Sequence, residues 1–266
     1  MEMEIPEEWN DPNSPARRGG WLSIGPDDGH ITVVDRFFAP DRKVDDKQRY
    51  LLCWHDNVGW WDLHTPEGTC LRSFQGQQRN MARLFDRLDR DIDLSAPERK
   101  IAVLLESPHK DEYDNELRPL GPARGATGRN FQKYFVSHVV PMLGLAGLDL
   151  RDAVYRIYLV NPVPYQASLR YLISSQGARR RLGDKLKNEV WKVLWNAGCQ
   201  TDFVGRLMEY RPQIVLNGCT KDVKQLVTCA LNSRGSEFGL EQHFNVSHPS
   251  DWQRALAPFK SGRAHL

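Results

Sequence analysis

The stretch IAVLLESPHKDEY, residues Ile101–Tyr113, decides the fold. Its first five residues are apolar and follow the charged run Glu98-Arg99-Lys100. A short apolar run bounded by charges is typical of a strand buried on both faces, as in a parallel sheet. Pro108 cannot continue a strand, so the chain must turn after Glu106. The turn therefore places polar side chains at the carboxyl end of a strand, where ligands bind in open parallel sheets.

Strand and helix patterns alternate along the rest of the chain. Strands are expected at Ile31–Phe38, Tyr50–Trp54, Gly59–Leu63, Cys70–Phe74, Ala153–Val160, Gln213–Leu216 and Phe244–Val246. Apolar residues at helical spacing predict helices near 81–92, 131–142, 182–194, 202–210 and 223–230. This order predicts an α/β three-layer sandwich with a largely parallel central sheet flanked by helices, plus a small N-terminal antiparallel β ribbon. We expect an N-terminal arm over residues 1–20, a β-rich appendage over 21–78 and an α/β domain over 79–266.

Composition narrows the class of protein. The chain has 266 residues, 40% of them hydrophobic, with a net charge of +2, so any affinity for nucleic acid must come from local basic patches. No apolar run approaches the length of a membrane span, and the acidic opening MEMEIPEEWNDP lacks a signal peptide's apolar region, so we expect a cytoplasmic monomer with no membrane contact. The five cysteines are far apart and include no C-x-x-C, which predicts reduced thiols and neither a metal site nor a cofactor.

Each predicted strand of the second half ends in a polar turn. Glu106-Ser107-Pro108-His109 follows the first, Asn161-Pro162 the second, Asn217-Gly218 the third and Ser247-His248-Pro249-Ser250 the last. In a parallel sheet these turns share one edge. A carboxylate, an amide and an imidazole at that edge are the groups of a site for a polar heterocycle.

In four segments the sequence resembles the uracil-DNA glycosylase superfamily. Leu105-Glu106-Ser107-Pro108 is similar to the first family motif (GQDPY or GEAPG), and Thr127-Gly128-Arg129-Asn130-Phe131 to a TGRPF stretch. Tyr158-Leu159-Val160-Asn161 resembles a strand ending in LLLN or ITN, and His248-Pro249-Ser250 matches the motif HPS. The resemblance spans roughly residues 100 to 255 and implies the fold of that family.

The resemblance also implies roles for individual residues. The catalytic group would be Glu106 near the sugar, Asn161 on the pairing edge of a flipped base, and His248 as donor to the base oxygen that gains charge. Asp111, Glu112 and Asp114 remain alternatives for the acid. The residues expected to contact the base are Ser107, Pro108, His109, Phe131, by stacking, and Asn161.

The sequence departs from the family at two positions. Ser107 stands where the best-studied branch has a water-activating Asp, and His109 stands where that branch has a Tyr that excludes larger bases. We therefore expect a modified pyrimidine as substrate, such as a glucosylated hydroxymethylcytosine of phage DNA, with a role in phage defence. Ordinary uracil repair, a non-catalytic reader of modified DNA and a hydrolase of free nucleosides are the alternatives.

The partner implied is DNA, double- or single-stranded. Trp252 is the candidate wedge between bases, because the family inserts an apolar side chain from the loop after its last motif. Lys110 would be the residue for a Schiff base, but a water nucleophile is favoured. The residues expected to contact DNA are Arg124, Arg129, Ser250, Trp252, Arg254, Arg180 and Lys187.

Overall fold

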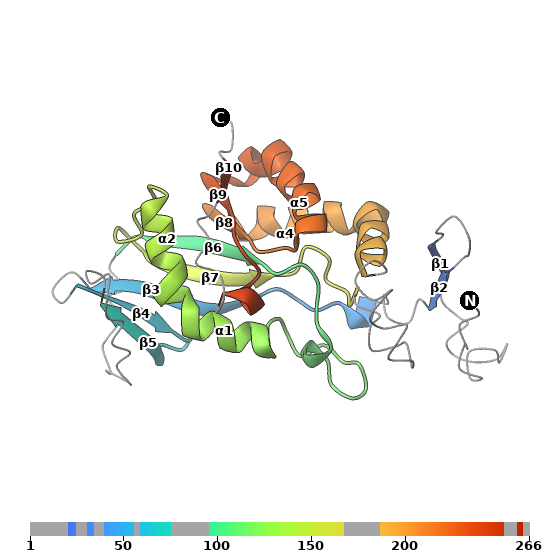
Figure 1. Cartoon of the computed structure of the whole chain (residues 1–266), viewed down its shortest axis with the longest axis horizontal. Helices are drawn as coiled ribbons and strands as arrows, with labels where there is room; N and C mark the ends of the chain where they lie inside the picture. Colours follow the sequence, from blue (N-terminus) through green and yellow to red (C-terminus); the bar gives the residue numbers. More distant parts are fainter. Residues whose placement is uncertain are drawn as a thin grey trace.

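The computed structural model describes residues 21–24, 31–34, 40–55, 59–75, 96–167, 187–252 and 260–262 (Figure 1). The expected arm (1–20), the expected helix near 81–92, Arg180 and Arg254 lie outside these residues. No helix among the described residues combines the length and apolar character needed to cross a membrane. All five cysteines are free thiols, and four of them are buried.

One mixed sheet of eight strands runs through the molecule in the order β10-β9-β8-β6-β7-β3-β4-β5. Its strands are β3 (Lys47–His55), β4 (Trp60–His64), β5 (Cys70–Gln75), β6 (Glu98–Leu104), β7 (Val154–Val160), β8 (Ile214–Asn217), β9 (Gln242–Asn245) and β10 (Lys260–Gly262). A separate hairpin consists of β1 (Trp21–Ile24) and β2 (Ile31–Val34).

The parallel arrangement is confined to the centre of the sheet. Strand β6 pairs in parallel with β7 on one side and β8 on the other, and β8 pairs in parallel with β9. All other pairs are antiparallel. The expected antiparallel ribbon is present as β3–β5, and its β3 hydrogen-bonds to β7, so the ribbon continues the central sheet.

Helices cover both faces of the sheet (Figure 1). They are α1 (Ala126–Tyr134), which continues through a π-helical turn (Phe135–Val139) into α2 (Val140–Leu145), a helix over 187–194, α4 (Gln200–Tyr210) and α5 (Lys221–Arg234). Short 3₁₀ turns occupy Pro40–Arg42, Lys110–Glu112, Gly235–Phe238 and Pro249–Asp251.

Strand β6 explains why the sheet has two apolar faces. Its Ala102 and Leu104 pack into the cluster that contains Val223 of α5, whereas Ile101 and Val103 pack into the cluster that contains Phe135. Successive side chains of a strand point to opposite faces, so a continuous apolar run is required where both faces are covered. The strand expected from the opening stretch is therefore present, and it is central.

Candidate functional site

The carboxyl ends of β6, β7, β8 and β9 meet at one edge of the sheet. Backbone hydrogen bonds continue past the strand ends, from Leu105 N to Val160 O at 2.9 Å, from Gly218 N to Leu104 O at 3.0 Å and from Val246 N to Asn217 O at 3.0 Å. Because these four strands are mutually parallel, the residues that follow them emerge side by side. The polar turns predicted to share an edge do share it.

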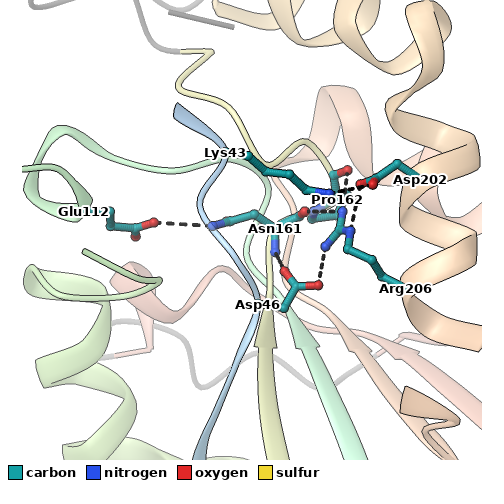
Figure 2. Close-up of polar contacts among 7 residues, drawn as sticks. All are labelled: Lys43, Asp46, Glu112, Asn161, Pro162, Asp202 and Arg206. Carbon is teal, nitrogen blue, oxygen red and sulfur yellow. Dashed lines mark hydrogen bonds and ion pairs between the residues drawn. The ribbon is translucent and has the colours of Figure 1, made fainter. Parts of the chain in front are cut away.

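Asn161, directly after β7, is fully buried and contacts a second buried polar side chain. Its Nδ2 donates to Glu112 Oε2 at 3.3 Å (Figure 2). The other carboxylate oxygen of Glu112 accepts from Ala123 N at 2.8 Å. Burial raises the pKa of Glu112 to about 7, although these hydrogen bonds oppose the rise. Asn161 Oδ1 is buried and accepts no hydrogen bond from any residue that the structure describes. Such an atom is costly unless a ligand supplies a donor.

A buried ionic network holds the backbone of Asn161 from the opposite side. Strand β3 runs antiparallel to β7, so Asp46 at its start lies beside the end of β7, and Asp46 Oδ1 accepts from Asn161 N at 3.2 Å. Arg206 of α4 pairs with Asp46 and donates to the carbonyl oxygens of Asn161 at 3.0 Å and Pro162 at 3.4 Å (Figure 2). The Arg206 Nε also binds Asp202 at 2.8 Å. These contacts fix the main chain from which the Asn161 amide projects.

Asp202 carries the network to the protein surface. Its Oδ1 lies 2.6 Å from Lys43 Nζ, so two acids and two bases alternate along the chain of contacts (Figure 2). A buried guanidinium that satisfies two carboxylates and two carbonyls uses the fixed fork geometry that Arg has and Lys lacks. The network therefore acts as a rigid support for the turn after β7.

Glu106, two residues beyond the end of β6, is a fixed buried anion. Its Oε1 lies 2.7 Å from Lys187 Nζ, and its Oε2 accepts from Thr220 N at 2.8 Å. Burial raises the pKa of Glu106, but Lys187 and the Thr220 N–H outweigh burial, so the pKa lies below its ordinary value. The residue has φ +127°, a conformation that costs about 1–3 kcal/mol for a non-glycine residue. Its carbonyl is held by Trp191 Nε1 at 3.0 Å.

His248, in the turn after β9, is a neutral imidazole with a defined tautomer. Its Nδ1 accepts from Ser250 N at 3.2 Å and lies 2.8 Å from Ser250 Oγ, so the proton of the neutral ring is on Nε2. Burial lowers the pKa of His248, against the opposing charges of Glu106 and Asp251. A hydrogen bond to the carbonyl of Leu105, the residue before Glu106, places the ring beside the end of β6.

The two aromatic side chains expected to contact a base or DNA are buried in this structure. Phe131 is fully buried and stacks on Tyr50 at 4.7 Å and on Phe135 at 4.5 Å between ring centroids. Trp252 packs against Phe131 at 5.4 Å and donates its Nε1 to Ser247 O at 2.8 Å. Both rings belong to the apolar core, because burying an aromatic side chain stabilises the fold more than leaving it exposed to solvent. Stacking on a base by Phe131 and wedging into DNA by Trp252 therefore stay predictions, and in this conformation both rings pack against protein side chains.

The remaining predicted contacts are distributed along the same edge. Pro108 is buried, Ser107 is partly buried and His109 is exposed, with its Nδ1 accepting from Asp111 N at 3.4 Å. Arg124, Arg129 and Ser250 are exposed. Lys187 differs from the expectation of a phosphate contact, because its ammonium is the partner of Glu106. The alternative acids Asp111 and Asp114 lie on the outside of the loop, and only Glu112 reaches Asn161.

Sequence reasoning missed Asp46, Lys43, Asp202 and Arg206. Lys43 and Asp46 lie in the charged run Asp41–Lys47, in which no single residue stands out, and the contacts join positions up to 160 residues apart. The one signal was Asp202–Arg206 spacing on an amphipathic helix, which is common on solvated faces. A second missed group, His55, Asp62 and His64, could hold a metal ion and lies on the antiparallel ribbon.

In comparisons with known proteins, no family model, curated protein or solved structure matches the chain.

Proposed function

We propose that this protein is a monofunctional DNA glycosylase that extrudes a pyrimidine and hydrolyses its N-glycosidic bond. The observation that carries the proposal is the Asn161 carboxamide, buried at the carboxyl edge of the sheet with an acceptor oxygen that no described residue satisfies. An amide held in this way can accept from a base N–H and donate to a base oxygen. A base inside a duplex has its pairing edge occupied, so reading that edge requires base flipping.

Glu112 is the group that we assign to water activation. Its pKa of about 7 makes it a carboxylate able to accept a proton near neutral pH, which a carboxyl of ordinary pKa does poorly. It reaches Asn161 directly, so a base bound to the amide would lie next to it. This choice differs from Glu106, the acid expected from the motif.

Glu106 then acts as a fixed negative charge at the end of β6. It stays ionised because of Lys187 and the Thr220 N–H, and an oxocarbenium-like sugar is stabilised by a nearby anion. His248 would supply its Nε2–H to the base oxygen that gains charge on bond cleavage. In the free protein this proton is directed at the Leu105 carbonyl. The base oxygen would replace that carbonyl as acceptor, because a charged acceptor forms the stronger hydrogen bond.

The substrate class that we propose is a pyrimidine with a bulky substituent, such as glucosylated hydroxymethylcytosine in phage DNA. The supporting feature is His109, whose side chain is exposed and is held by its own 3₁₀ turn, so it does not close the site as a buried aromatic ring would. Uracil in DNA is the competing substrate.

The test is the formation of alkali-labile abasic sites. Wild-type protein is incubated with duplex and single-stranded DNA carrying cytosine, uracil or glucosylated hydroxymethylcytosine, and strand cleavage after alkali is measured. We expect product on the modified DNA, and a fall of about 100-fold or more for Asn161→Ala, His248→Ala and Glu112→Gln. Glu116→Gln is the matched control, since this exposed carboxylate lies in the same loop. If abasic sites form only in uracil DNA, the substrate is uracil and not a modified pyrimidine. If all three variants keep the wild-type rate, the proposed site is wrong.

One observation favours a second candidate, a non-catalytic reader of modified DNA. The Glu106 carboxylate is neutralised by Lys187 and so presents less negative charge to a sugar cation. A reader would bind modified DNA without forming abasic sites, and Asn161→Ala would weaken that binding.

A further inference from the structure

Three potential metal ligands lie together at the opposite end of the ribbon from Asn161. His55 is the last residue of β3, and Asp62 and His64 are on neighbouring β4. One ligand atom from each lies within 4.8 Å of the other two, and the side chains of Asp62 and His64 are fully buried. The start of β3 pairs with the end of β7, so His55 is remote from the candidate site.

The tautomer of His64 is set by its surroundings. Its Nδ1 lies 3.1 Å from the carbonyl oxygen of Gly68, which can only accept, so Nδ1 carries a proton. A neutral ring with its proton on Nδ1 has its lone pair on Nε2. That Nε2 has no hydrogen-bond partner within the described ranges and faces Asp62 Oδ2 at 3.9 Å. A lone pair that faces a carboxylate in a buried place is repelled unless a cation lies between them.

The His55 ring lies within ion-pair distance of the same carboxylate. Its Nε2 lies 3.0 Å from Asp62 Oδ2, yet the approach lacks hydrogen-bond geometry. Ligands of one metal ion have this relation, since each points at the ion and not at its neighbour. For metal–ligand distances of about 2.0–2.1 Å, tetrahedral ligand atoms are about 3.3 Å apart. The separations of 3.0 and 3.9 Å lie on either side of that value.

We propose that His55, Asp62 and His64 bind one divalent transition-metal ion, with Zn²⁺ as the best match. Two imidazoles and a carboxylate suit zinc, whereas Mg²⁺ and Ca²⁺ prefer oxygen ligands alone. The hydrogen bond from His64 Nδ1 to the Gly68 carbonyl is the outer contact that orients metal-bound histidines. Cys53 is paired with Asp62 across β3 and β4, so a thiol is on the same face of the sheet.

The ion would join two strands of the antiparallel ribbon. Residues 59–75 form β4 and β5 at the outer edge of the sheet, and β4 is attached to the rest through β3. A metal bound to His55 on β3 and to two residues on β4 fixes their register. Metal binding is therefore expected to stabilise the fold and to leave the chemistry at Asn161 unaffected.

The test measures zinc binding by the full-length chain and does not depend on glycosylase activity. Protein stripped with a chelator and dialysed against Zn²⁺ alone is analysed for metal content, and zinc affinity is measured by competition with a chromogenic chelator. We expect about one zinc per chain, a higher melting temperature with Zn²⁺ and no such shift with Mg²⁺. His55→Ala, which is partly exposed and tolerates truncation better than His64, should weaken zinc binding at least 10-fold. His138→Ala, a partly buried histidine on the helical face, is the matched control.

Two results would overturn the proposal. Stripped wild-type protein that stays folded by circular dichroism but takes up no zinc would make the cluster a buried histidine–aspartate pair. Equal loss of zinc in His55→Ala and His138→Ala would place the metal elsewhere. Wild-type stoichiometry decides the first question even if a variant fails to fold.

Discussion

Replacing Glu112 by Gln should make the protein more stable above pH 7 and should leave its stability almost unchanged near pH 4.5. Glu112 is 4% exposed, and burial raises its pKa from 4.5 to about 7. Between these values the folded state holds a proton that the unfolded state has released. Stability therefore falls as pH rises through this window, and the loss is complete above the folded pKa.

The shift corresponds to about 3 kcal/mol of unfolding free energy at pH 8.5. Gln is uncharged at both pH values, and its carbonyl oxygen can still accept from Ala123 N. The gain of Glu112→Gln over wild type should consequently be larger at pH 8.5 than at pH 4.5 by about 3 kcal/mol. Taking the difference between two pH values cancels every other titrating group, as long as the substitution does not alter those groups.

The assay is urea denaturation of wild type, Glu112→Gln and Glu116→Gln at the two pH values. The exposed Glu116 controls for loss of a charge in the same loop and should show a difference of less than about 0.5 kcal/mol. If the Glu112 difference is also below about 1 kcal/mol, Glu112 is an ordinary carboxylate and our reason for assigning it to water activation is wrong.

Three further tests use four variants: one in the ionic network, a pair of glycine substitutions in α1 and α2, and one at the partner of Glu106. Arg206→Met should cost about 3–5 kcal/mol in urea denaturation, since it leaves the Asp46 carboxylate buried without its cation; a cost below 1 kcal/mol would contradict the proposed support. Gly128→Ala should lower the free energy of unfolding by about 1–3 kcal/mol, because the added Cβ would collide with a backbone carbonyl. Gly144→Ala is the control: its Cβ meets open space, so it should be neutral or stabilising in the same urea denaturation experiments. Lys187→Met should raise the carboxyl pKa of its partner above the ordinary value, measurable by carbon NMR titration, and an unchanged pKa would show that the ion pair is absent in solution.

The central strands could be predicted from sequence because their signal is local. The run Ile101–Leu105 is apolar without alternation, which only a strand covered on both faces requires, and the turn at Pro108 marks its end. The position of Asn161 followed in the same way from the strand before it. These residues needed no knowledge of distant partners.

The ribbon and the aromatic residues could not be placed by such reasoning. The sequence of Lys47–His55 does not indicate that this strand pairs with β7. Its pairing depends on which edge strand of the sheet is free once the parallel core has formed. Phe131 and Trp252 show the same limit. Each occurs where the family resemblance implies a DNA contact, but the cluster with Tyr50 of β3 buries both rings. Burying an aromatic ring in the core is more favourable than exposing it on the surface, unless a ligand replaces the contacts that exposure loses.

Three unfavourable features of this protein lie at the carboxyl edge of the parallel strands. Glu106 has a left-handed backbone, Glu112 is a carboxyl kept from ionising fully at neutral pH, and Asn161 has a buried oxygen without a donor among the described residues. Each of these features costs stability. Next to them the ionic network is well satisfied, because Arg206 contacts two carboxylates and two carbonyls. Since strain and unmet hydrogen-bonding capacity gather at functional sites, the occurrence of three such features at this edge supports the proposed site independently of the motif resemblance. It also predicts that a ligand with both a donor and an acceptor will raise the melting temperature of wild type more than that of Asn161→Ala.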